Sequence, residues 1–92
     1  MKDIPVEEYK IDGKPVEQYW TEKIAKHLVG KKIVKVEYFP KDMMEDMMWH
    51  SRPITLHLDD GSIIAPQMDD EGNDGGAMLT TFKDLGTIPV IS

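Results

Sequence analysis

Carboxylate and amide side chains are densest between residues 69 and 76, and they are the groups in this chain best suited to binding a cation. The segment carries Asp69, Asp70, Glu71, Asn73 and Asp74. Hard cations such as Ca²⁺ take several oxygen ligands from such groups. The spacing differs from that of an EF-hand, because a count from Asp70 places Gly72 third and Thr81 twelfth, where oxygen ligands belong. A hydrated surface loop whose glycines permit turns is therefore favoured over a calcium site.

Three further side chains that could contribute to a site, Trp49, His50 and Arg52, directly precede a predicted strand. Aromatic, cationic and acidic groups near strand ends can together bind a polar ligand, and loops on a rigid scaffold often carry function. The candidate ligand-binding residues are therefore Trp49, His50, Arg52, Asp69, Asp70, Glu71, Asn73 and Asp74. The competing interpretation is structural, with Arg52 in a surface salt bridge to an Asp.

Residues arranged for catalysis are missing from the sequence. The serines lack a nucleophile-elbow motif, the histidines lack the spacing of a metalloprotease helix, and there is no cysteine. His57 is expected to be a structural histidine, on the face of its strand opposite to Leu56 and Leu58. The sequence thus predicts no catalytic residue, no metal site and no cofactor, and it favours a protein without enzymatic activity.

The segment from residue 43 to residue 48 contains four methionines, which would form one stripe on a helix. They are Met43, Met44, Met47 and Met48. We expect this stripe to cover a sheet as part of the core. The alternatives are an adaptable surface for a partner protein and a Cu(I) site that includes His50.

The first half of the chain predicts a helix over residues 14–29, a strand over 32–39 and a short helix near 42–48. Asp12-Gly13 precedes the first helix, and Gly30 suits the position just after it. An apolar residue recurs at every fourth position: Val16, Trp20, Ile24 and Leu28. This stripe predicts packing against a sheet, with Trp20 buried.

A β-hairpin is predicted over residues 51–66, because apolar residues alternate along its first strand. Asp60-Gly61 suits a two-residue type I′ loop, which needs positive φ at both positions. Such a loop would place Leu58 opposite Ile63, and Leu56 opposite Ala65.

These elements predict a single α+β domain over residues 1–92, with residues 1–12 as an arm or a turn. Strands at 77–81 and 87–91 follow the hairpin, and Pro89 places the last of them at a sheet edge. The expected architecture is a mainly antiparallel sheet of four or five strands, packed by both helices. The alternative is a small SH3-like barrel with the helices appended.

Composition excludes several classes of protein. Residues 41–92 hold ten acidic and three basic side chains, and the whole chain has a net charge of −6. This charge repels phosphate backbones, so nucleic-acid binding is not expected. No apolar run approaches the roughly 18 residues of a membrane span, and the N-terminus has no apolar signal-peptide core. We expect a cytoplasmic protein with no membrane contact.

The stretch from Trp49 to Ala77 resembles a pattern of small, uncharacterised bacterial single-domain proteins. The resemblance is carried by Trp49-His50-Ser51-Arg52-Pro53, Leu58-Asp59-Asp60-Gly61, Pro66, Asp69-Asp70-Glu71-Gly72-Asn73 and Gly76-Ala77. It implies a bacterial source and no established activity, and it carries over no catalytic residue. The function expected is a non-enzymatic protein-binding or interaction module, with an unknown protein or a second copy in a weak homodimer as partner. The alternative is an enzyme or a small-ligand or cation-binding domain that uses the candidate residues above.

Overall fold

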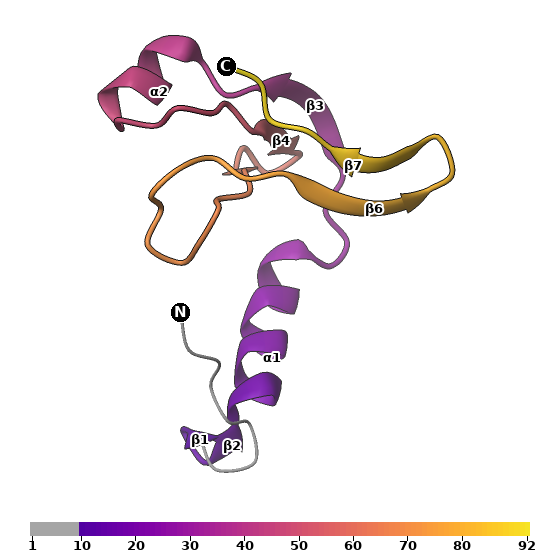
Figure 1. Cartoon of the computed structure of the whole chain (residues 1–92). Coiled ribbons are helices and arrows are strands. Elements are labelled where there is room, and N and C mark those ends of the chain that lie inside the picture. Colours follow the sequence, from indigo (N-terminus) through magenta and orange to yellow (C-terminus); the bar gives the residue numbers. More distant parts are fainter. Residues whose placement is uncertain (1–9) are drawn as a thin grey trace. The chain divides into compact units, whose positions relative to one another are not determined.

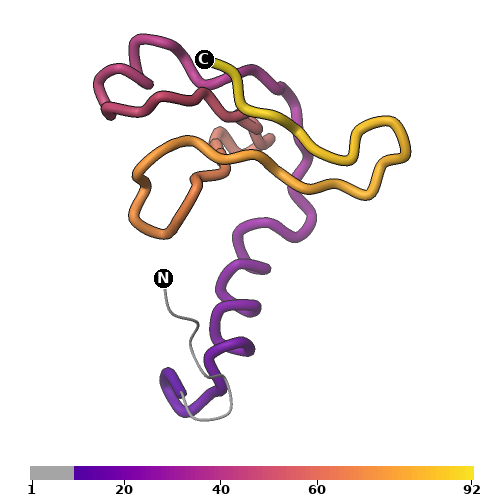
Figure 2. Tube along the Cα trace, viewed as in Figure 1, coloured from indigo at the N-terminus to yellow at the C-terminus, as the bar shows by residue number. Residues whose placement is uncertain are grey.

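The computed structural model describes residues 10–92, and their helices and strands confirm the α+β class (Figures 1 and 2). The chain divides into two compact units between Lys31 and Lys32. The first unit contains β1 (Lys10–Ile11), β2 (Lys14–Pro15) and α1 (Val16–Leu28). The second contains β3 (Ile33–Tyr38), α2 (Lys41–Asp46), β4 (Ile54–Leu58), β5 (Ile63–Ile64), β6 (Met78–Phe82) and β7 (Leu85–Ile88). A single domain over 1–92 stays a prediction, and residues 1–9 of the predicted arm lie outside the described residues.

The first unit begins with the β1–β2 hairpin, whose loop is Asp12-Gly13. Ile11 pairs with Lys14, and φ is positive at both loop residues, 51° at Asp12 and 78° at Gly13. These values match a two-residue type I′ loop, which Asp-Gly favours. Helix α1 follows directly and confirms the helix predicted over 14–29. It ends before Gly30, whose φ of 83° suits the left-handed residue that follows a helix.

The sequence predicted that the apolar stripe of α1 would be buried, but most of it is exposed. Val16 is buried, but Trp20 is 45% exposed, and Ile24 and Leu28 are exposed as well. The two-residue strands β1 and β2 offer too little surface to cover a helix of 13 residues. Trp20 instead packs edge-on against Tyr19, with the ring centroids 5.3 Å apart.

The second unit contains a three-stranded antiparallel sheet in the order β3-β4-β5. Its β4–β5 hairpin differs from the prediction by one residue, because Leu56 pairs with Ile64 rather than with Ala65. The loop has three residues, since the Leu58 N–H donates to Ser62 O at 2.9 Å and φ is positive at Gly61 alone of the loop residues. The Asp60 carboxylate supports this loop by accepting the Ser62 N–H at 2.9 Å.

The predicted single sheet of four or five strands is wrong for the described residues, and the SH3-like barrel stays a prediction. Strands β6 and β7 pair only with each other, and the three sheets contain two, three and two strands. Proline explains why β5 and β7 both end where they do, because it has no N–H to donate to a β-ladder. Pro66 follows the short strand β5, and Pro89 ends β7 at Ile88, where the sequence had predicted a strand continuing to residue 91.

The core of the second unit centres on Phe39, Met44 and Trp49. Pro53, Thr55 and Leu58 are also buried. The methionine stripe is therefore core at Met44 alone, while Met43, Met47 and Met48 are exposed. Helix α2 is only six residues long and Met48 lies beyond it with a φ of 61°, so the four side chains do not share one helical face.

Candidate functional site

The structure brings Trp49 to the acidic loop, as the candidate site requires. The Trp49 side chain is 5% exposed and lies 5.1 Å from the Phe39 ring, measured between centroids. Its indole Nε1–H donates to the carbonyl oxygen of Gly72 at 2.8 Å. A buried indole needs such an acceptor. Trp49 therefore anchors the loop onto the core, and little of its ring is left for a ligand.

Asp74 joins the loop to the segment that precedes β4. Its Oδ1 atom accepts three backbone N–H groups, from His50 at 3.0 Å, Ser51 at 2.9 Å and Gly75 at 2.8 Å. Desolvation raises the pKa of Asp74, but these hydrogen bonds stabilise the charged form more strongly, and the pKa lies below its ordinary value. The carboxylate thus serves as a cap for backbone amides rather than as an open ligand.

Asp69 organises the tip of the loop in the same way. Its carboxylate accepts the side-chain amide of Asn73 at 2.8 Å and the backbone N–H of Glu71 at 3.0 Å. The Asn73 side chain, with these backbone bonds, holds the pKa of Asp69 below its usual range. Asp70 makes no hydrogen bond or ion pair with any described residue. Most of the loop's polar groups are therefore engaged within the loop itself.

Arg52 and His50 do not turn their side chains into this cluster. Arg52 Nε donates to the Phe39 carbonyl at 2.7 Å, and Arg52 forms no ion pair with any Asp among residues 10–92. His50 contributes its backbone N–H and is otherwise exposed. No group of three or more His, Cys, Asp or Glu side chains in the described part of the chain could hold a metal ion. Ligand or cation binding by these residues stays a prediction.

Two glycines of the loop are needed for close packing rather than for an unusual φ. A Cβ on Gly75 would lie 2.5 Å from Pro53 Cδ and 2.7 Å from the Ser51 carbonyl oxygen. A Cβ on Gly76 would lie 2.7 Å from the Gln67 carbonyl oxygen. Such distances leave no room for a side chain. Only Gly72, with φ of 72°, fits the turn-forming role predicted for the loop's glycines.

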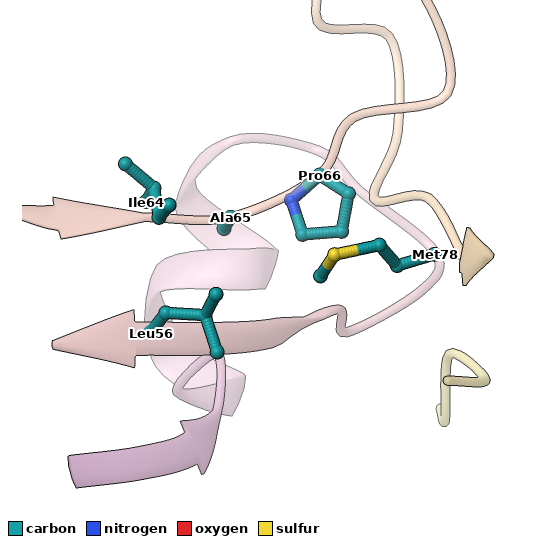
Figure 3. A pocket seen from close by; sticks show the side chains of 5 residues that line it. All are labelled: Leu56, Ile64, Ala65, Pro66 and Met78. Atoms are coloured by element: carbon teal, nitrogen blue, oxygen red, sulfur yellow. The ribbon is translucent and has the colours of Figure 1, made fainter. Parts of the chain in front are cut away.

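A different region of the second unit contains an open apolar pocket of about 230 Å³ (Figure 3). It is lined by Leu56, Ile64, Ala65, Pro66 and Met78. Leu56 and Ile64 face the same side of the sheet because they are directly paired. Met78 reaches from β6 toward Pro66 and Leu56, as Figure 3 shows. No lining residue carries a charged or hydrogen-bonding side chain.

The sequence did not predict this pocket, because the predicted hairpin register was wrong by one residue. With Leu56 opposite Ala65, the side chain of Ile64 would point to the other face of the sheet. The signal available was the pair Asp60 and Ser62, because the Asp60 carboxylate accepts both the backbone N–H and the hydroxyl of Ser62 and so favours the longer loop. Met78 enters the pocket from a strand of another sheet, which the hairpin pattern does not reveal.

Comparisons with protein-family models, with curated proteins and with solved structures found no match to this chain. No helix among residues 10–92 is long and apolar enough to cross a membrane.

Proposed function

We propose that this chain is a non-enzymatic protein-binding module, and that its apolar pocket accepts one apolar side chain of a partner. The observation that carries the proposal is the pocket itself, which is open, apolar and about 230 Å³ in volume. Metabolite and cofactor sites are larger, roughly 300–1,000 Å³, and contain placed polar groups. A single anchoring side chain needs less space and an apolar lining.

The acidic charge of residues 41–92, which make up most of the second unit, indicates which residues should flank the apolar anchor of the partner. Residues 41–92 hold ten acidic and three basic side chains. A partner segment with Lys or Arg on either side of its apolar anchor would be attracted, and its association would weaken as salt is added. A bacterial, cytoplasmic setting belongs to the same proposal. It is supported by the absence of cysteine from the sequence and by the resemblance carried by Trp49 to Ala77.

A displayed library of random peptides tests this function and does not require the partner to be identified. Selection on the wild-type chain should enrich peptides that carry a Leu, Met or Phe between basic residues. Ala65→Phe fills the pocket and should reduce binding of the selected peptides by about tenfold or more. Ala77→Phe makes the same change at an exposed residue outside the pocket and should bind them like the wild type.

The folded state of both variants is checked by circular dichroism and urea denaturation before binding is compared. Failure to enrich any such peptide would contradict the proposal. Equal binding by wild type, Ala65→Phe and Ala77→Phe would show that the peptides bind elsewhere, and would contradict it as well.

A further inference from the structure

Strand β3 is the outer strand of its sheet, and its outer edge makes no backbone hydrogen bond with the described residues. The direction of its backbone groups follows from Phe39, whose N–H donates to Pro53 O at 2.9 Å. Backbone groups alternate along an antiparallel strand, so those of Lys35 and Glu37 also face β4. The N–H and C=O groups of Val36 and Tyr38 consequently point away from the sheet.

The side chains along this edge are unusually apolar for a surface strand. Ile33, Val34 and Val36 are 59%, 63% and 57% exposed. Strand β3 contains no proline, and its ladder with β4 is regular from Lys35 to Tyr38. The irregularity lies between Ile33 and Lys35, which makes Val34 a bulged residue. An exposed, apolar and largely regular edge is a template for another strand.

We propose that this edge pairs with the β3 edge of a second copy of the chain, antiparallel and about a two-fold axis through Val36. At that axis the outward N–H of each Val36 donates to the Val36 carbonyl of the other copy. Lys35 then lies opposite Glu37 of the second copy, and Glu37 opposite its Lys35. The two ion pairs are generated by symmetry from one strand. This charge complementarity argues for a second copy as the occupant.

The other two-fold registers within β3 are less favourable. An axis through Lys35 places two ammonium groups opposite each other, and an axis through Glu37 does the same for two carboxylates. An axis through Val34 is centred on the bulge. An axis through Tyr38 brings Val36 against Pro40, which has no N–H to donate.

The charged side chains are already placed for this pairing. His57 Nε2 lies 2.8 Å from a Glu37 carboxylate oxygen, which keeps that carboxylate over the middle of the strand. The Lys35 ammonium lies 3.4 Å from the same oxygen, and its side chain is 60% exposed. The lysine of one copy can therefore reach the glutamate of the other with little rearrangement.

Charge reversal gives the sharpest test, with sedimentation equilibrium over the widest concentration range that solubility allows. Wild type should be a concentration-dependent dimer. Lys35→Glu alone and Glu37→Lys alone should each weaken the dimer by about tenfold or more, because two attractive pairs become repulsive. An equimolar mixture of these two variants should dimerise like the wild type, and so should the Lys35→Glu/Glu37→Lys double variant.

A backbone test examines the same register. Val36→Pro removes an outward N–H and no hydrogen bond to β4, and it should abolish the dimer, whereas Val36→Thr keeps the N–H and should retain it. In wild type, hydrogen exchange at the Val36 amide should slow as concentration rises, while the Lys35 and Glu37 amides, bonded to β4, should not change. If Val36→Pro does not fold, the charge variants and the exchange measurement decide.

A monomer at every concentration would overturn the proposal. A dimer that the single charge reversals leave intact would overturn it too, as would a mixture of the two variants that stays monomeric. Dimerisation and the proposed peptide binding can be tested separately, because Ala65 lies outside β3. Ala65→Phe should therefore lose the selected peptides and keep the dimer.

Discussion

The acidic loop and the apolar pocket of the second unit use their side chains in opposite ways. In the loop, Asp69 and Asp74 accept hydrogen bonds from nearby backbone and amide groups, and Gly75 packs where no Cβ would fit. In the pocket, five apolar residues line an open space. Polar residues concentrated in the sequence thus stabilise the fold, while the apolar space is where we propose that a partner binds.

This difference changes how a cluster of polar residues should be interpreted. A carboxylate that caps three amides has little left to offer a ligand, since a cation would have to compete with those bonds. Apolar surface exposed on a small domain instead has an unfavourable free energy of hydration, and a bound partner removes that surface from water. What decides whether each region can bind a partner is whether its groups already have partners within the chain, and not which residue types it contains.

The largest effect is expected from Trp49→Ala, which removes the contact between the loop and the core. The ring is 5% exposed and packs on Phe39. Loss of a buried tryptophan costs about 3–5 kcal/mol in the free energy of unfolding. Urea denaturation should show this loss at neutral pH.

Trp20→Ala is the matched control for that prediction. Trp20 is 45% exposed, its ring packs edge-on against Tyr19, and the Lys23 ammonium lies 5.4 Å from its centroid. Its loss should cost about 1 kcal/mol or less. A Trp20→Ala variant as destabilised as Trp49→Ala would show that the α1 stripe is buried after all, as the sequence predicted.

Local elements of the fold were predictable from the sequence where short-range chemistry decides them. Helix α1 and strands β3 and β6 lie close to their predicted positions, whereas β7 begins two residues before its predicted strand and ends three residues before that strand does. The dipeptide Asp-Gly shows the limit of such reasoning. It forms a two-residue loop at Asp12-Gly13, but at Asp60-Gly61 only the glycine has positive φ and the loop has three residues. The neighbouring Ser62 stabilises the second arrangement.

The contact between Trp49 and the acidic loop was predictable from the sequence, but the bonding partners of the other candidate residues were not. The sequence predicted that Trp49 lies near the segment 69–74, and the indole does contact Gly72. It did not reveal that Arg52 would bond to the Phe39 carbonyl, or that Asp74 would cap backbone amides. Those partners are backbone atoms distant in sequence, which a pattern of side chains does not specify. The division into three sheets was missed for a related reason, because strand pairing is a long-range property.

A smaller effect is expected from Asp74→Asn, which keeps an oxygen acceptor and removes its charge. At neutral pH the variant should be less stable than wild type, because charged acceptors form stronger hydrogen bonds. Folding lowers the pKa of Asp74 below its ordinary value of 3.8. Its stabilisation is therefore complete above that value and is lost as pH falls through the lowered pKa. The difference between the two proteins should narrow in acid.

Urea denaturation at several pH values between about 2 and 7 measures this difference. Asp70→Asn is the control, because Asp70 has no bonding partner among the described residues, and it should follow the wild type throughout. An Asp74→Asn variant as stable as wild type at neutral pH would contradict the capping role. A difference in stability between wild type and Asp74→Asn that persists unchanged below the lowered pKa of Asp74 would contradict it as well.

The smallest effect is expected from adding calcium. This experiment tests most directly whether the acidic loop, like the apolar pocket, has groups free to bind a partner. In an NMR titration with Ca²⁺ or Mg²⁺, amide shifts should be weak, should not saturate and should spread over all acidic residues. The reason is that Asp69 and Asp74 already accept hydrogen bonds within the chain, so a cation gains only diffuse attraction to the acidic surface. A titration with sodium chloride at matched ionic strength should give the same pattern. Saturating shifts confined to residues 49–52 and 69–76, and absent with sodium, would instead establish the loop as a cation site and reverse the distinction drawn between the two regions.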